Sequence, residues 1–215
     1  MKLAPEGWPF VAAAACVELG FVGAALAWGG GWWVGAAAWF PVAVWVPVFF
    51  RNPRREGPRG PHLVIAPADG RVVAVVEEHE PSYIRGQARR VSVFMNVFNV
   101  HVNRYPVSGP IEHREYRPGR FLNAALEKAS EHNERASVGI RGPRGRVLVR
   151  QIAGLIARRI VTDGSLGTAA RQGERLGLIR FGSRVDTFLP TDARTLVRVG
   201  DRARAGVTVL AEFGA

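Results

Sequence analysis

A Gly-Ser pair near the C-terminal end carries the clearest chemical signal in this sequence. Gly182 and Ser183 lie in the segment RFGSRVD and follow a run typical of a β-strand. An isolated Gly-Ser pair usually forms a turn. A serine hydroxyl held over the carbonyl group of the preceding glycine could instead attack its own backbone, because glycine leaves that carbonyl open and reaches backbone angles that other residues avoid.

Two upstream segments supply the side chains that would activate such a hydroxyl. Asp69 lies in PADGRV, and His101 lies in FNVHVNRYP. His101 could take the proton of the Ser183 hydroxyl, and Asp69 could orient the imidazole and stabilise its cation. Taken alone, Asp69 reads as a turn residue and His101 as a core histidine. Together the three side chains predict a catalytic site.

These three segments, in this order and ahead of a short C-terminal tail, resemble the phosphatidylserine decarboxylase proenzymes, in particular the short bacterial form. The resemblance spans nearly the whole chain. It implies self-cleavage between Gly182 and Ser183, into a β chain of residues 1–182 and an α chain of residues 183–215. This chain has Phe-Gly-Ser-Arg where the family has a Leu-Gly-Ser-Thr type sequence, and so keeps the two residues that the cleavage requires.

The resemblance also implies the cofactor and the reaction. Ser183 would become a pyruvoyl group that forms a Schiff base with the amine of phosphatidylserine, so that phosphatidylethanolamine and CO₂ are released without a metal ion. His101 would be the general base of self-cleavage and is a candidate proton donor after decarboxylation. Many longer family members have a second histidine three residues earlier, where this chain has Phe98. The proton donor therefore stays open.

The first fifty residues predict a membrane hairpin. Residues 10–28 and 32–50 are apolar stretches of 19 residues each, separated by glycines. As helices they would each be about 28 Å long, which matches one bilayer crossing. Tryptophans lie at the ends of both stretches, where indole rings favour the membrane interface. Glu18 lies in the middle of the first stretch, so the hairpin either spans the bilayer or dips into one leaflet.

Arginines that follow the second stretch predict the orientation of the chain. Arg51, Arg54, Arg55 and Arg59 come directly after it, and by the positive-inside rule they place the remainder of the chain in the cytoplasm. The expected location is the cell (inner) membrane, with the catalytic domain on its cytoplasmic side. A cleaved signal peptide is the competing interpretation, and the second apolar stretch argues against it.

Net charge and cysteine content limit the kinds of partner and cofactor that this chain can bind. Beyond residue 50 the chain holds 28 of its 29 basic residues and 16 of its 18 acidic ones, a net charge of +12. Such a charge favours an anionic partner. Aromatic residues do not alternate with the arginines as single-strand binding requires, so we expect an anionic lipid surface and no nucleic acid. Cys16 is the only cysteine, which excludes an intrachain disulfide and a thiolate metal cluster.

The remainder of the chain predicts a mainly β (α+β) fold, an antiparallel β domain. Short runs rich in valine and isoleucine are separated by glycine and proline. Arg120–Asn133 reads as a helix or a loop, and residues 199–207 look like the hairpin of barrel-sandwich hybrid folds. The predicted domains are residues 1–55 and 56–215. The expected strands are 63–66, 71–76, 89–100, 107–116, 136–140, 147–162, 175–180, 196–199 and 207–213.

Two functions of other classes stay open from the residues alone. One is a membrane-tethered hydrolase with Asp69, His101 and Ser183 as an ordinary triad, although the chain lacks a G-x-S-x-G elbow. The other is a noncatalytic basic module that binds lipid or nucleic acid. The decarboxylase interpretation alone predicts two chains, as a heterodimer of the cleaved parts or a higher oligomer. The remaining histidines read as surface or structural residues: His62, His79, His113 and His132.

Overall fold

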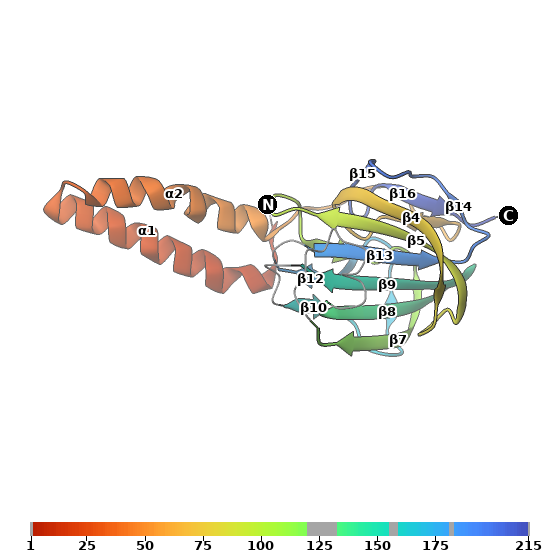
Figure 1. Cartoon of the computed structure of the whole chain (residues 1–215). Coiled ribbons are helices and arrows are strands. Elements are labelled where there is room, and N and C mark those ends of the chain that lie inside the picture. The colour runs from red at the N-terminus through yellow and green to blue at the C-terminus, as the bar shows by residue number, and fades with distance from the viewer. Residues whose placement is uncertain (1, 120–132, 155–158, 181–182, 215) are drawn as a thin grey trace. The chain divides into compact units, whose positions relative to one another are not determined.

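The chain folds into two compact units, Met1–Arg54 and Arg55–Ala215. The computed structural model describes residues 2–119, 133–154, 159–180 and 183–214. The first unit holds two helices, and the second consists of β-strands (Figure 1).

The first unit is a helical hairpin with a two-stranded ribbon at its base. The ribbon pairs Lys2 with Asn52 and Leu3 with Arg51. The elements in chain order are β1 (Lys2–Leu3), the 3-10 turn η1 (Pro5–Gly7), α1 (Trp8–Trp28), α2 (Trp32–Phe49) and β2 (Arg51–Asn52). The two helices confirm the apolar stretches predicted at 10–28 and 32–50.

Glycines determine how the hairpin turns and packs. Gly29 and Gly30 have φ angles of +64° and +61°, in the left-handed region that side chains disfavour, and α1 therefore ends before them. Within the hairpin, the indole N–H of Trp39 donates a hydrogen bond of 3.0 Å to the carbonyl oxygen of Ala14. This bond links α2 to α1.

Both helices are long and apolar enough to cross a membrane. Their large apolar side chains point outward: Leu26 is 74% exposed and Trp28 is 73% exposed. A helix that is apolar on all sides suits a lipid environment. Glu18 is half-buried, and one of its carboxylate oxygens has no hydrogen-bond partner among the described residues.

The second unit confirms the predicted antiparallel β fold. Its largest sheet has eight strands in the order β11-β7-β8-β9-β13-β5-β4-β15, and two three-stranded sheets have the orders β10-β12-β6 and β14-β16-β3. Every pair of neighbouring strands is antiparallel. The strands are β3 (Leu63–Ile65), β4 (Gly70–Glu80), β5 (Gly86–Met95), β6 (Val102–Arg104), β7 (Gly109–Arg117), β8 (Arg135–Gly142), β9 (Gly145–Ala153), β10 (Ile160–Thr162), β11 (Ala169–Ala170), β12 (Arg175–Ile179), β13 (Ser183–Leu189), β14 (Arg194–Thr195), β15 (Arg202–Ala203) and β16 (Val209–Glu212).

β13 occupies the middle of the large sheet, between β5 and β9 (Figure 1). All seven of its residues are buried. Val185 and Leu189 on one face of the strand join the main hydrophobic core together with Val93 and Val149 of the neighbouring strands. The alternation of side chains along a strand places Ser183 on this same face.

The structure corrects the predicted strand pattern in several places. β13 has no counterpart in the predicted pattern, and neither have the short strands β6, β11 and β14. The run expected at 89–100 ends at Met95, because the chain turns after it. The single run expected at 147–162 forms β9 and β10. The strand expected at 196–199 is absent, because this segment enters a turn in which the backbone N–H of Arg198 donates to Asp201 Oδ2 at 2.9 Å. The helix or loop expected at Arg120–Asn133 lies outside the described residues, apart from Asn133.

Candidate active site

Ser183 begins the central strand and is fully buried. It lies opposite Met95 at the end of β5 and opposite Ala153 at the end of β9. The residue is 0% exposed, and its hydroxyl has no hydrogen-bond partner among the described residues. Gly182, the other half of the predicted cleavage site, lies outside the described residues. The structure thus places a buried serine hydroxyl without a partner at the end of three neighbouring strands.

A buried ion pair follows the serine on the other face of β13. The guanidinium group of Arg184 donates two hydrogen bonds to the carboxylate of Asp186, of 2.8 and 2.9 Å. The two side chains are 2% and 0% exposed. Arg90 adds a second cation, 3.6 Å from Asp186 Oδ2. A bidentate pair of this kind fixes both side chains, and it fixes the backbone directly after Ser183.

His101 is brought to the same end of the sheet by a short turn. Asn96 and Asn99 brace this turn after β5: the Asn96 backbone N–H donates to Asn99 Oδ1 at 2.9 Å. His101 then precedes β6, and its carbonyl oxygen accepts a hydrogen bond from Ile179 of β12 at 3.3 Å. β12 ends four residues before Ser183 in the sequence, and Met95 before the turn is the register partner of Ser183. Both predicted residues therefore lie close to the ends of the same strands.

The ring of His101 is held by the backbone. The residue is 0% exposed, and its Nδ1 lies 3.0 Å from the carbonyl oxygen of Asn99. A carbonyl oxygen only accepts hydrogen bonds, which assigns the proton to Nδ1. In the neutral ring, Nε2 then carries the lone pair that a general base needs.

Asp69 lies between an arginine and a backbone amide. Arg55 donates to its Oδ2 at 2.6 Å, and the backbone N–H of Ala205 donates to its Oδ1 at 2.7 Å. These are the hydrogen bonds that the structure describes for Asp69, and they differ from the bond to His101 that the triad interpretation expects. The predicted orienting role of Asp69 stays a prediction.

Further arginines surround this carboxylate. Burial lowers the pKa of Arg104, Arg55 adds to the lowering, and Asp69 opposes it. Gly206 allows this crowding: its φ is +72°, and a Cβ atom there would lie 2.8 Å from Arg104 Cδ. The surroundings of Asp69 are thus strongly cationic.

A chain of buried amides ties the strands together beneath the site. Asn103, two residues after His101, donates to the sulfur of Met95 at 3.6 Å. Its Oδ1 accepts a hydrogen bond of 2.8 Å from Gln151, whose Oε1 accepts one of 2.8 Å from Thr162. Sequence reasoning missed this chain. Its one signal is the alternation of valine with polar residues in VHVN, which puts His101 and Asn103 on the same face of a strand.

A pocket of about 720 Å³ opens beside these residues. Asp69 and Asn99 line it, as do Phe94 and Asn96 on either side of Met95. Its other lining residues are Gly70, Arg71, Arg202, Ala203, Arg204 and Thr208. The pocket therefore reaches three strands of the large sheet, β4, β5 and β15, of which β5 is the neighbour of β13. Its volume is in the range of small-molecule sites.

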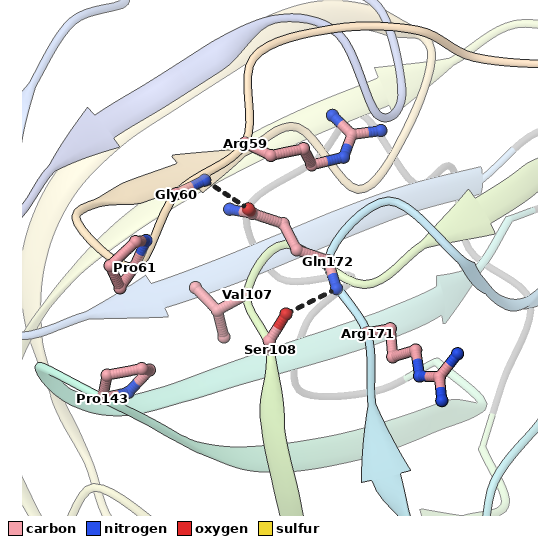
Figure 2. A pocket seen from close by; sticks show the side chains of 8 residues that line it. All are labelled: Arg59, Gly60, Pro61, Val107, Ser108, Pro143, Arg171 and Gln172. Carbon is pink, nitrogen blue, oxygen red and sulfur yellow. Dashed lines mark hydrogen bonds between the residues drawn. The ribbon is translucent and has the colours of Figure 1, made fainter.

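In a second pocket, of about 420 Å³, the polar groups of Gln172 bond to other parts of the protein (Figure 2). Gln172 crosses it: the backbone N–H of Gln172 donates to the Ser108 hydroxyl at 2.9 Å, and the Gln172 Oε1 accepts from the Gly60 N–H at 3.0 Å. The side-chain amide of Gln172 also donates to the carbonyl oxygens of Leu63 and Pro106. Because all these polar groups of Gln172 are engaged within the protein, we assign this pocket no chemistry.

The remaining histidines agree with their predicted structural or surface roles where they are described. His62 and His79 are exposed, and His113 stacks on Tyr83 with the ring centroids 5.6 Å apart. His132 lies outside the described residues. Within the described segments, no three side chains of histidine, cysteine, aspartate or glutamate gather as a metal site would require.

Comparison with known proteins defines the class to which this chain belongs. The sequence profile of the phosphatidylserine decarboxylases matches residues 42–211. A phosphatidylserine decarboxylase proenzyme of Azorhizobium caulinodans is 47% identical over 213 residues, which cover 98% of this chain and 88% of that protein. The proenzymes of Aromatoleum aromaticum and Symbiobacterium thermophilum are each 48% identical, over 98% and 97% of this chain and 95% and 94% of their own lengths.

Both the profile and the relatives cover most of the sequence, including the segments of Asp69, His101 and Ser183. The chain therefore belongs to the phosphatidylserine decarboxylase family. As a member of that family it is an enzyme of the lyase class.

Proposed function

We propose that this chain is a proenzyme that cleaves itself between Gly182 and Ser183 and then converts phosphatidylserine to phosphatidylethanolamine and CO₂. One observation supports this most directly. The Ser183 hydroxyl is fully buried and has no hydrogen-bond partner among the described residues. Leaving a hydroxyl in this state costs about 1–3 kcal/mol, and such groups call for a functional explanation. Attack on the adjacent peptide bond supplies one.

Each of the three side chains has a role in this proposal. The Ser183 oxygen attacks the carbonyl carbon of Gly182, and Nε2 of His101 takes the hydroxyl proton. The peptide bond breaks as the acyl group moves to the oxygen, and the amide nitrogen is released as an amine. In this proposal the carboxylate of Asp69 stabilises the imidazolium that forms when His101 takes the proton. The Arg184–Asp186 pair holds the backbone after Ser183 still during the attack.

The residues present fit a pyruvoyl group at position 183. Elimination of the ester would release the carboxylate of Gly182 and leave dehydroalanine, and hydrolysis of dehydroalanine would release ammonia and leave the pyruvoyl group at the new N-terminus. The buried position of residue 183 shields this group from bulk water. When formed, the group supplies a ketone that condenses with the substrate amine and draws electrons from the bond to the departing carboxylate. His101 would return a proton to the product.

After cleavage the two chains would stay together without a covalent bond. The α chain begins with β13, which is paired along its length with β5 on one side and β9 on the other. The C-terminal strand β16 of the same chain pairs with β3. Separation would therefore split the largest sheet through its middle and expose the core. We expect the mature enzyme to contain both chains.

The helical hairpin would anchor the enzyme where its substrate is. Its helices are long and apolar enough to cross a bilayer, and basic residues follow directly after them. By the positive-inside rule the β unit would face the cytoplasm, at the inner membrane of a bacterial cell. A lipid substrate would then need to move only within the membrane plane to reach the enzyme.

Intact mass under denaturing conditions tests this function. The purified protein should give two chains that divide at residues 182 and 183, with the α chain carrying a pyruvoyl group in place of serine. Ser183→Ala should give one uncleaved, inactive chain, because the attacking oxygen is missing. Ser92→Ala, which also removes a buried hydroxyl, should still cleave. A Ser183→Ala protein that is split and active would overturn the proposal.

A further inference from the structure

Three arginines whose guanidinium groups have no partner among the described residues line the pocket beside the candidate site. They are Arg71, Arg202 and Arg204. Arg71 and Arg202 are register partners on β4 and β15. None of the three guanidinium groups has a hydrogen bond or an ion pair within the described part of the chain. Like charges placed opposite each other on neighbouring strands repel, so this arrangement favours an anion between them.

The rest of the pocket leaves this positive charge uncompensated. Asp69 is its only acidic lining residue in the described chain, and Arg55 and the Ala205 N–H already bind that carboxylate. The other polar lining residues are neutral: Asn96, Asn99 and Thr208. A ligand that enters the pocket therefore meets three guanidinium groups, whose fork of donors matches phosphate oxygens.

The pocket lies close to the serine along the sheet. Phe94 and Asn96 line it, and Met95 between them is the register partner of Ser183. Directly opposed residues of an antiparallel pair lie roughly 5 Å apart at their Cα atoms. Phe94, Arg71 and Arg184 are register partners, so their side chains lie on the face of the sheet opposite to Ser183. Asn96 and Asn99 extend the pocket of about 720 Å³ past the end of β5, and a small molecule that follows them around this end approaches the first residue of β13.

We propose that Arg71, Arg202 and Arg204 bind the phosphodiester group of the phospholipid substrate. This inference rests on the proposed function. Two anionic groups of the substrate could bind these arginines, the phosphodiester and the serine carboxylate, and the reaction favours the phosphodiester. A guanidinium pair would stabilise the carboxylate in the ground state and so oppose its loss as CO₂. The phosphodiester keeps its charge throughout the reaction, and binding it orients the headgroup at no such cost.

Binding of soluble headgroups to the full-length Ser183→Ala protein tests the assignment without turnover. The probes are glycerophosphoserine, which contains the phosphodiester, and L-serine and inorganic phosphate as comparisons, measured by calorimetry. Each of Arg71→Gln, Arg202→Gln and Arg204→Gln should raise the Kd of glycerophosphoserine about tenfold, which is about 1.4 kcal/mol. Binding of L-serine should stay the same, and inorganic phosphate should bind more weakly than glycerophosphoserine.

Arg85→Gln is the matched control. Arg85 is exposed at the turn between β4 and β5, roughly 30 Å from Arg71 along β4 at about 3.3 Å per residue. Its substitution removes the same charge and should leave the Kd unchanged. An equal loss in Arg85→Gln would show a general charge effect and overturn the assignment. Unchanged binding in all three pocket variants would do the same, and so would inorganic phosphate binding more tightly than glycerophosphoserine.

Kinetics of the cleavage-competent protein give a second readout. With a short-chain phosphatidylserine, each pocket variant should raise KM about tenfold with little change in kcat, as loss of uniform binding predicts. A fall in kcat at constant KM would contradict a binding role. Different results would overturn the self-cleavage proposal and the arginine proposal. A wild-type protein that stays one chain would overturn the self-cleavage, and the calorimetric result would still decide whether the arginines bind a phosphodiester.

Discussion

At the scale of single residues, the orientation of His101 depends on the main chain. Its Nδ1 faces the carbonyl oxygen of Asn99, which no side-chain substitution removes. The carboxylate of Asp69 instead contacts Arg55 and Ala205. Loss of the imidazole and loss of the carboxylate should therefore have different effects on self-cleavage.

His101→Ala should slow self-cleavage by about 10²–10⁴-fold, the usual contribution of a general base. Asp69→Asn should slow it by about tenfold, because it removes the negative charge that would stabilise the imidazolium and leaves the base itself in place. His79→Ala, at an exposed position of β4, is the control and should cleave normally. The rates are followed on denaturing gels after synthesis. Normal cleavage in both site variants would show that neither residue takes part.

Glu80 should make the stability of the fold depend on pH. Burial acts to raise the pKa of Glu80, but hydrogen bonds from the Ser82 hydroxyl and from the N–H groups of Tyr83, Ile84 and Ser82 outweigh it and hold the pKa below its ordinary value of 4.5. Arg150 pairs with the same carboxylate at 2.9 Å. Because the folded pKa is lowered, this stabilisation is present above pH 4.5 and is lost as the pH falls through the folded value.

Glu80→Gln should therefore lower the free energy of unfolding at pH 7 by roughly 3 kcal/mol, since the half-buried Arg150 loses its counter-charge. It should also weaken the dependence of stability on pH between about 5 and 3. Thermal unfolding followed by circular dichroism in detergent measures both effects. Glu77→Gln removes an exposed partner of Arg89 and serves as the control. Parallel pH curves for wild type and Glu80→Gln would refute this account.

At the scale of elements, β13 is the strand on which the site depends. It begins with Ser183 and continues with the buried Arg184–Asp186 pair. Asp186→Asn should destabilise the protein by about 3–5 kcal/mol, because a buried guanidinium loses its counter-charge. It should also slow self-cleavage of the molecules that remain folded, because the backbone after the serine is less firmly held.

An exposed ion pair provides the comparison for this strand. Arg194 and Glu212 lie 2.6 Å apart with side chains 73% and 34% exposed. Glu212→Gln should cost at most about 1 kcal/mol, as is usual for surface pairs. Thermal unfolding and the fraction cleaved are measured on both variants. If Asp186→Asn matches Glu212→Gln in both measurements, the buried pair holds neither the strand nor the serine.

The same strand shows where sequence reasoning stops. The helical hairpin and the antiparallel β class follow from apolar length and from alternation, and both are confirmed. The sequence pattern did not predict β13, because Arg184 and Asp186 interrupt its apolar residues. In the structure both side chains are buried as a pair. The contacts of Asp69 with Arg55 and Ala205 could not be predicted either. Arg55 is 14 positions and Ala205 is 136 positions away from Asp69 in the sequence, so only the folded chain brings them together.

At the scale of the whole molecule, anchoring and chemistry belong to separate parts of the chain. Deleting residues 1–50 should release the protein from the bilayer and leave self-cleavage intact, because Asp69, His101 and Ser183 all lie in the second unit. Turnover of long-chain lipid in vesicles should fall far more than turnover of a short-chain soluble analogue. Sedimentation with vesicles and lipid analysis measure the two effects. An equal loss on both substrates would mean that the hairpin shapes the site.

Raising the salt concentration in the same experiment distinguishes insertion of the hairpin into the bilayer from electrostatic attraction of the basic residues to its surface. Basic residues near an anionic membrane contribute roughly 1 kcal/mol each, and salt screens this attraction. The truncated protein should leave anionic vesicles as the salt concentration rises, whereas the full-length protein should stay in the membrane pellet. Release of the full-length protein by salt alone would show that the hairpin does not insert.

The central position of β13 has a genetic consequence. A strand held on both sides by the sheet has to be in place when that sheet forms, so a 183–215 segment made by one molecule cannot later enter another. Two defective alleles in one cell, one with Ser183→Ala and the other with an inactivating change before residue 182, should therefore fail to restore growth that depends on this enzyme. Each gene copy would have to encode a complete and self-sufficient polypeptide, and selection would act on its two halves as one inherited unit.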